Sequence, residues 1–221
     1  MKTRILCTLL LAGLAAQTLT AQRAPKPADS LTPVNFVSDD DGGVVQIVPA
    51  DVPAAGPRKA HAVPLMKSIQ QVSIFLGSAW ADPNVRAREG TLADLGAQLT
   101  ELRNSNTQVL PAAPSVEDFS DLTKSPVNDL GVQRKLVEML ESKAIPAPGS
   151  STVYIVFLAP GISSSVGKST GGVHYAAYHS LLHTTAGEVR YIVVPFNENA
   201  GQLAAAASSA LVETAFNPRG D

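Results

Sequence analysis

The sequence has little cysteine, few aromatic residues and no excess of charge of one sign, and each shortage excludes a class of protein. One cysteine among 221 residues cannot form an internal disulfide framework or a zinc site built from several thiolates. Aromatic residues make up 5% of the chain, so few stacking surfaces are available for sugars. The formal net charge of -2 gives no support to nucleic-acid binding through bulk electrostatics. Hydrophobic residues nevertheless reach 45%, which predicts a folded globular domain.

The N-terminus has the order of a secretory signal peptide. Lys2 and Arg4 precede an apolar run over residues 5–16, and small or polar residues follow up to Ala21. We expect cleavage after Ala21, which removes residues 1–21 together with the cysteine. The apolar run is shorter than the ~20 residues that a transmembrane anchor needs. We therefore expect a secreted or periplasmic bacterial protein without such an anchor; a buried N-terminal helix is the alternative.

Composition divides the remaining chain into two parts. Residues 22–69 are rich in proline, which blocks regular elements, and are predicted to be an extended leader. One short strand is expected within it, at residues 44–48. The three consecutive aspartates at 39–41 favour a solvated turn over a calcium site, because the alternating acids of an EF-hand are missing. Residues 70–221 are predicted to form a single α/β domain.

Hydrophobic patterns in the second part predict an α/β or α+β fold, with a mixed β-sheet of about 4–5 strands covered by about three helices. Strands are expected at residues 72–76, 153–158, 172–179 and 188–194, the last two joined as a hairpin. Helices are expected at residues 91–102, from 128 or 129 to about 145, and at 201–216. Thr91 is the expected N-cap of the first helix, with Asp94 completing a capping box. The strand at 153–158 is continuously apolar, which predicts burial on both faces.

The loop over residues 161–169 resembles a phosphate-binding loop, because it follows a buried strand and ends in Gly-Lys-Ser. A phosphate-binding loop has four residues between its glycines, however, and it opens a helix. Here five residues separate the glycines, and a β-type segment follows. We therefore predict a flexible Ser/Gly loop without nucleotide.

Three of the four histidines, His174, His179 and His183, are close in sequence. On a helix, His179 and His183 would form a chelating pair for zinc. On the predicted strand they are ~13 Å apart, and His174 and His179 point to opposite faces. A metal site here therefore requires a bend in the chain, and the simpler interpretation is a set of polar side chains with His179 partly buried. Tyr178 and Tyr175 are predicted to be packing residues rather than an acid–base pair.

Four segments together resemble the bacterial branch of the Exordium-like, phosphate-induced secreted proteins. They lie at residues 75–80, 145–161, 175–180 and 189–196, and the resemblance covers residues 70–221. The final helix in many relatives carries a His-Glu pair that resembles the helices of metallohydrolases. Here Leu211, Glu213, Asn217 and Pro218 match, but Ser209 and Ala210 stand in place of that pair. The chain also ends soon after Pro218, where relatives continue, so we expect a degenerate and truncated motif.

The expected function is that of a secreted, non-catalytic Exordium-like protein with a cell-envelope or extracellular role, and with a polysaccharide as its possible partner. A hydrolase that uses His179 with Glu213 is the alternative. His174 and Tyr178 are further catalytic candidates, and zinc is the expected ion. A second alternative is a surface carbohydrate-binding module in which Trp80 supplies the stacking surface.

Overall fold

The computed structural model describes residues 34–37, 44–49, 64–96, 99–120, 122 and 126–219. The signal peptide, its cleavage site after Ala21 and the aspartates at 39–41 lie outside these residues. The strands are β1 (Val34–Val37), β2 (Val44–Pro49), β3 (Ser68–Leu76), β4 (Gln108–Val109), β5 (Val116–Asp118), β6 (Val127–Asn128), β7 (Thr152–Leu158), β8 (Ser164–Val166), β9 (Ser169–Thr170), β10 (Tyr175–Thr184) and β11 (Gly187–Val194). The helices are η1 (Ser78–Ala81), α1 (Pro83–Arg86), α2 (Glu89–Leu92), α3 (Thr100–Asn104), α4 (Asp129–Glu141) and α5 (Ala200–Phe216). No helix in the described ranges is long and apolar enough to cross a membrane.

Eight strands form one mixed sheet in the order β1-β2-β10-β11-β7-β3, with β4 and β5 both paired to β3. The central strands β11, β7 and β3 are parallel to one another, and β4 and β5 are parallel to β3. The strands β10, β2 and β1 continue the sheet in antiparallel fashion. The expected hairpin is confirmed as β10 and β11, and the predicted mixed α/β fold is confirmed. The sheet has more strands than expected, because β1 and β2 join it from the stretch that was expected to be an extended leader. β2 lies where a strand was expected, at residues 44–48.

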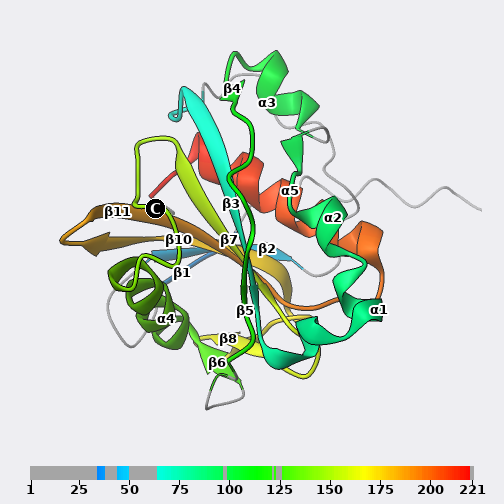
Figure 1. The fold of residues 1–221 in the computed structure, drawn as a ribbon. Coiled ribbons are helices and arrows are strands. Elements are labelled where there is room, and N and C mark those ends of the chain that lie inside the picture. Colours follow the sequence, from blue (N-terminus) through cyan, green and yellow to red (C-terminus); the bar gives the residue numbers. More distant parts are fainter. Residues whose placement is uncertain are drawn as a thin grey trace, which may run out of the picture.

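Helices cover both faces of this sheet (Figure 1). α5 and the short helices α1–α3 lie on one face, and α4 lies on the other. The strand β7 is buried along its whole length, as its continuous apolar sequence predicts. Its alternate residues belong to the two separate cores, because successive side chains of a strand point to opposite faces.

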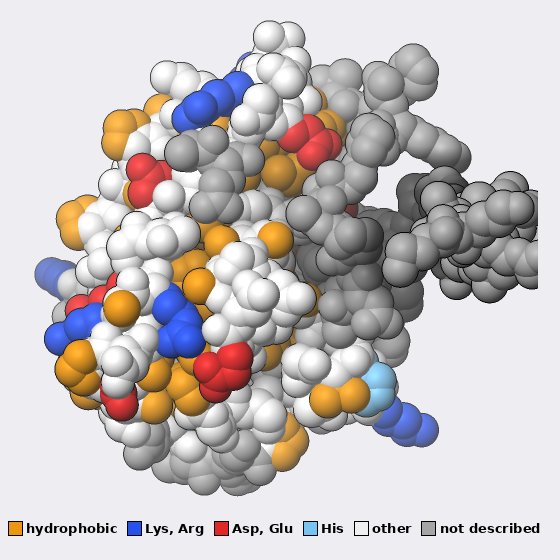
Figure 2. All heavy atoms as spheres, turned by 90° about the vertical axis from the view of Figure 1, so that its right-hand side faces the viewer, with side chains coloured by type: hydrophobic (Ala, Val, Ile, Leu, Met, Phe, Trp, Pro, Cys, Tyr) orange, Lys and Arg blue, Asp and Glu red, His pale blue; other side chains and the backbone are white. Residues whose placement is uncertain are grey.

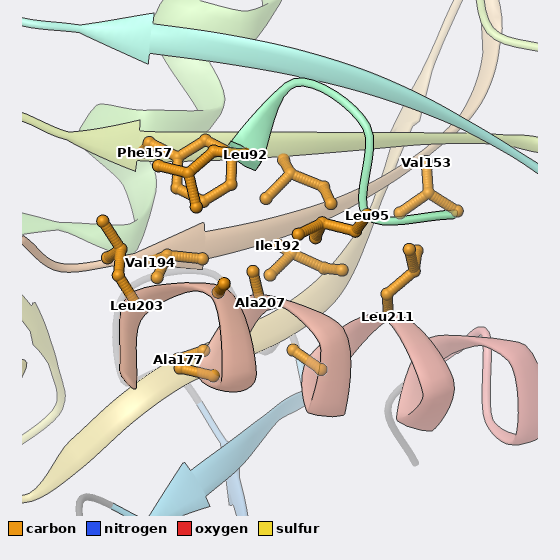
Figure 3. Close-up of a cluster of buried hydrophobic side chains, with 14 of the residues drawn as sticks. Leu92, Leu95, Val153, Phe157, Ala177, Ile192, Val194, Leu203, Ala207 and Leu211 are labelled. Atoms are coloured by element: carbon orange, nitrogen blue, oxygen red, sulfur yellow. The ribbon is translucent and has the colours of Figure 1, made fainter. Parts of the chain in front are cut away.

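The core on the α5 face is drawn in Figure 3. Leu203, Ala207 and Leu211 of α5 point at the sheet, where they meet Ile192 of β11 and Val153 of β7. Small alanines on α5 let the helix approach the strands closely, which keeps the packing dense. The expected helix over 201–216 and its apolar stripe are both confirmed, and Asn199 caps the first turn by accepting hydrogen bonds from the backbone N–H groups of Gly201 and Gln202.

The helix expected over residues 91–102 is wrong. α2 ends at Leu92 and α3 begins at Thr100, although the leucines that suggested the helix are all buried. The buried side chain of Gln71 takes up the backbone groups that a continuous helix would have used. Its Nε2 donates to the Leu92 carbonyl over 2.7 Å, and its Oε1 accepts from the Leu95 N–H over 3.0 Å. Hydrogen bonds from a strand side chain therefore take the place of intrahelical ones. Leu92 reaches the core from α2 and Leu102 from α3, while Leu95 and Leu99 reach it from the irregular stretch between them.

The capping box at Thr91 and Asp94 is also wrong. Thr91 lies inside α2, and the Asp94 carboxylate accepts a hydrogen bond from the Gly96 N–H over 2.8 Å. The helix expected from residue 128 or 129 is confirmed as α4, with Asn128 as its N-cap through the Gly131 N–H. It ends at Glu141, before the expected Ile145, where the following backbone turns into the left-handed region at Lys143.

The loop over residues 161–169 is not a simple flexible loop. It contains β8, which pairs with β9 and with β6 in a small second sheet. The strand β9 begins at Ser169, the last residue of the Gly-Lys-Ser sequence, where a phosphate-binding loop would open a helix. The strand expected over 172–179 begins later, at Tyr175, and continues to Thr184, so His174 belongs to the preceding turn.

Candidate functional site

The histidines proposed as ligands or catalysts lie in three different environments. His174 is exposed in the turn before β10, where its Nδ1 accepts a hydrogen bond from the Thr170 N–H over 3.0 Å. His183 is exposed near the end of β10. His179 is fully buried, whereas partial burial was expected. Within the described residues, no group of three or more His, Cys, Asp and Glu side chains is arranged to hold a metal ion, and a zinc site at His179 and His183 stays a prediction.

Tyr178 and His179 are separated by the sheet itself. His179 pairs with Ile192, whose side chain packs against α5, whereas Tyr178 belongs to the core under α4. Neighbouring residues of a strand point to opposite faces, so these two side chains do not share a site. Glu213 lies on α5, partly buried. The packing role predicted for Tyr175 and Tyr178 is confirmed, because both are fully buried with their rings edge to face at 5.6 Å.

A buried polar cluster joins α4 to the sheet beside these tyrosines. The Tyr191 hydroxyl donates to the Asp129 carboxylate, with its oxygen 2.7 Å and 2.9 Å from the two carboxylate oxygens. Gln133 Nε2 donates to the same carboxylate over 2.7 Å and also lies 3.0 Å from the Tyr191 hydroxyl. Asp129 is only 2% exposed, and a buried carboxylate is tolerated where such donors surround it. We call these three residues the Asp129 cluster.

The tyrosines around this cluster stay protonated near neutral pH. Burial, together with the negative charge of Asp129, raises the pKa of Tyr191 and of Tyr178 well above the ordinary value of a phenol. A phenol held in this state donates hydrogen bonds and does not act as a base. The hydrogen bonds of the cluster fix α4 against β11.

Two neighbouring parallel strands near α4, β3 and β5, have connections on opposite faces of the sheet, which makes a topological switch point. The chain leaves β3 through Gly77 and continues as η1, α1, α2 and α3 on the α5 face. It leaves the neighbouring β5 through Phe119 and continues as α4 on the opposite face. Adjacent parallel strands whose connections go to opposite faces leave a crevice at their carboxyl ends, which is where open α/β sheets bind ligands. Asp118 and Gly77 meet at this point, since the Gly77 N–H donates to the Asp118 carbonyl over 2.8 Å.

A cleft of about 620 Å³ lies beside this switch, between α4, β6, β8 and the described residues 120, 122 and 126. We call it the α4 cleft. Its lining combines hydroxyl, amide, charged and apolar groups. The residues are Ser120, Leu122, Pro126, Val127, Asn128, Gly131, Arg134, Lys135, Glu138 and Ser165.

The charges in the α4 cleft are unequally paired. Lys135 Nζ lies 2.9 Å from the Asp118 carboxylate and 3.1 Å from that of Glu138. Burial disfavours the charged forms of Asp118 and Lys135, but hydrogen bonds from Ser120 and Lys135 outweigh this and lower the pKa of Asp118. The hydrogen bonds from Lys135 to Asp118 and Glu138 likewise outweigh burial and raise the pKa of Lys135. Arg134 is exposed and has no ion-pair partner among the described residues.

A second charged group lies on the other side of β5. Arg86 forms an ion pair with Glu117, and its Nε lies 3.8 Å from Glu89. Burial raises the pKa of Glu89, the neighbouring Glu117 carboxylate raises it further, and Arg86 partly opposes both. The Arg86 guanidinium also covers the ring of Phe119 at 5.4 Å. These contacts tie α1 and α2 to β5.

Figure 2 looks at the molecule from the right-hand side of Figure 1. On this face the described basic and acidic side chains are interspersed and form no continuous patch of one sign.

A second hollow lies at the opposite end of α4. It has a volume of about 720 Å³, and its lining is mainly apolar. It lies between the end of α4, the prolines that follow it and the turn of the β10–β11 hairpin. Lys143 borders it with a φ of 59°, a left-handed conformation that a glycine would adopt without strain. We call this the apolar hollow.

Comparison of the chain with protein-family models, with curated proteins and with solved structures finds no match.

The residues of the α4 cleft are those that the sequence reasoning missed. Asn128 was expected only as the start of a helix, and Arg134 and Lys135 resemble ordinary surface residues of that helix. Ser120 and Ser165 belong to segments with no motif of their own. The sequence contains one indirect signal of the cleft, namely polar residues between a strand and a capped helix. That strand, β5, has only three residues, which is too short for its pattern to be recognised.

Proposed function

We propose that the protein is an exported, non-catalytic binding protein whose α4 cleft takes a hydroxyl-rich ligand of the saccharide class. The observation that carries the proposal is the cleft itself, an open hollow beside the switch point that is lined by hydrogen-bond donors, acceptors and apolar groups. Its volume falls within the ~300–1,000 Å³ of small-molecule sites. The hydroxyls of Ser120 and Ser165 and the amide of Asn128 suit sugar hydroxyls, while Leu122 and Val127 suit the apolar faces of a sugar ring.

The non-catalytic part of the proposal draws on the positions of the catalytic candidates. Tyr178 and His179 lie on opposite faces of the sheet, and burial raises the pKa of the Tyr178 phenol well above its ordinary value. The resemblance to Exordium-like proteins and the signal peptide give the proposal its extracellular or cell-envelope setting, and both stay predictions. The hydrolase with His179 and Glu213 also stays a prediction, which a zinc measurement on the purified protein tests.

Trp80 is not the surface on which a sugar stacks. Its side chain is fully buried, and its Nε1 donates to the Phe157 carbonyl over 3.0 Å. Its ring packs edge to face against Phe75 at 4.9 Å. A Trp80→Ala variant therefore reports on folding rather than on binding, and the binding test belongs at the α4 cleft.

Filling the α4 cleft should abolish saccharide binding. The side chain of Ser165 lines the cleft from β8, so a Ser165→Trp variant places a large ring inside it. The experiment screens the protein, without residues 1–21, on an array of neutral and acidic oligosaccharides, and then measures the strongest binder by calorimetry. We expect binding to the wild-type protein, weakened at least ~10-fold by Ser165→Trp.

The matched control is Lys168→Trp. Lys168 is exposed in the turn between β8 and β9 and does not line the cleft, so this variant adds the same ring to the same small sheet. It should bind as the wild-type protein does. The proposal fails if the wild-type protein binds no oligosaccharide, or if Ser165→Trp binds as tightly as Lys168→Trp while both keep the wild-type circular dichroism spectrum.

A further inference from the structure

We infer that the saccharide bound in the α4 cleft carries a carboxylate, and that Arg134 binds it; the inference rests on the proposed function. Arg134 and Lys135 are the two cations that line the cleft among the described residues. Lys135 already has two carboxylate partners, at 2.9 Å and 3.1 Å, and its side chain is only 12% exposed. Its charge is therefore compensated within the protein before any ligand arrives.

Arg134 is in the opposite situation. It is exposed, it lines the cleft, and no carboxylate of the described residues pairs with it. The acidic residue of the described lining, Glu138, forms its ion pair with Lys135 on the same helix. A guanidinium presents a planar pair of N–H donors that matches the two oxygens of a carboxylate. Among the described residues the cleft thus offers one cation without an ion-pair partner, beside hydroxyl and amide groups that suit the remaining sugar hydroxyls.

A uronic acid combines these features in one small unit. It has a carboxylate on a ring that otherwise carries hydroxyls and apolar C–H groups. In a neutral sugar a hydroxymethyl group takes the place of the carboxylate, which leaves the Arg134 guanidinium without an ionic partner. The chemistry of the cleft therefore favours acidic over neutral saccharides of otherwise equal shape.

The test compares a short oligogalacturonate with the same oligomer after its carboxylates have been reduced to hydroxymethyl groups. Calorimetry on the protein without residues 1–21 should give at least ~10-fold tighter binding of the acidic oligomer, because a charge-assisted bidentate contact is lost in the neutral one. An Arg134→Gln variant should remove this preference and bind both oligomers alike. The control is Arg103→Gln, since Arg103 is an exposed arginine of α3 that lies outside the cleft.

The outcomes separate the two proposals. If the acidic and neutral oligomers bind the wild-type protein equally, or if Arg134→Gln keeps the preference, the role of Arg134 is wrong while saccharide binding stands. If neither oligomer nor any other saccharide binds, the proposed function itself fails. Loss of the preference in Arg103→Gln as well would show that it comes from the general charge of the protein and would overturn the inference.

Discussion

Replacement of Gly77 by alanine is expected to lower the free energy of unfolding by about 3 kcal/mol or more. Gly77 has φ 117° and ψ 149°, a region of backbone conformation that is open almost only to glycine. A Cβ atom at this position would also lie 2.5 Å from Ile162 Cδ1 and 2.7 Å from the Ala159 Cβ. The Ile162 side chain can rotate away, but the Ala159 Cβ moves only with its backbone, so strain and overpacking add.

The position of Gly77 makes this prediction relevant to the site. Gly77 begins the connection that leaves β3 on the α5 face, and its N–H holds the carbonyl of Asp118 at the end of β5. Urea denaturation of Gly77→Ala measures the loss. The control is Gly90→Ala in α2, where a Cβ meets nothing within 4 Å, so no loss of stability is expected. A Gly77→Ala protein within ~1 kcal/mol of the wild type would show that the backbone there is not constrained as described.

Tyr191→Phe is expected to cost about 2 kcal/mol, because it removes the hydroxyl that donates to a buried carboxylate. The Asp129 carboxylate would retain the Gln133 amide as a donor but lose its contacts of 2.7 Å and 2.9 Å with Tyr191. Loss of a hydrogen-bond donor destabilises the protein more when the buried acceptor is charged than when it is neutral. The charged group gave up more favourable hydration on folding, and the missing donor no longer replaces it. The ring of Tyr191 remains, so packing changes little.

Tyr154→Phe provides a matched comparison for Tyr191→Phe. Tyr154 is also fully buried and lies on the same face of the sheet, but its hydroxyl donates to the neutral carbonyl of Pro146 over 2.6 Å. Loss of this hydrogen bond should cost about 1 kcal/mol. Thermal and urea unfolding of both variants give the comparison. Equal losses, or a larger loss for Tyr154→Phe, would contradict the role assigned to the Asp129 cluster.

Elements whose pattern is local could be predicted from the sequence. The apolar run of β7 and the alanine- and leucine-rich repeat of α5 each contain enough information to define their own structure. The same holds for α4, where the N-cap residue and the spacing of the apolar residues predict the same helix. In the two helices neighbouring residues along the chain supply both the hydrogen bonds and the buried face. In β7 the local sequence supplies only the buried side chains, and the hydrogen bonds come from β3 and β11.

The segment with the four leucines shows where local patterns stop being sufficient. Its spacing is helical and its leucines are buried, yet its backbone bonds to Gln71 on a strand 21 and 24 residues away. A side chain so distant in sequence leaves no trace in the local pattern. The hydrophobic period therefore predicted burial correctly and the conformation incorrectly.

The α4 cleft was beyond prediction for a related reason. Its lining comes from residues 120, 122 and 126, from β6 and the α4 helix that follows it, and from β8, which pairs with β6. Taken singly, Ser120, Arg134 and Ser165 have the character of ordinary surface residues. They line one cleft only because the connections that follow β3 and β5 lie on opposite faces of the sheet. That arrangement depends on the order of strands in the sheet.

The most direct test of saccharide binding in the α4 cleft is an amide NMR titration of the protein, without residues 1–21, with the best-binding oligosaccharide. The proposed function predicts that the largest chemical-shift changes fall on residues 128–138 of α4 and its cap, and on Ser165 of β8. Changes centred instead on residues 145–148 and 184–186 would place the ligand in the apolar hollow. That result, or the absence of any change at saturating ligand, would contradict the account.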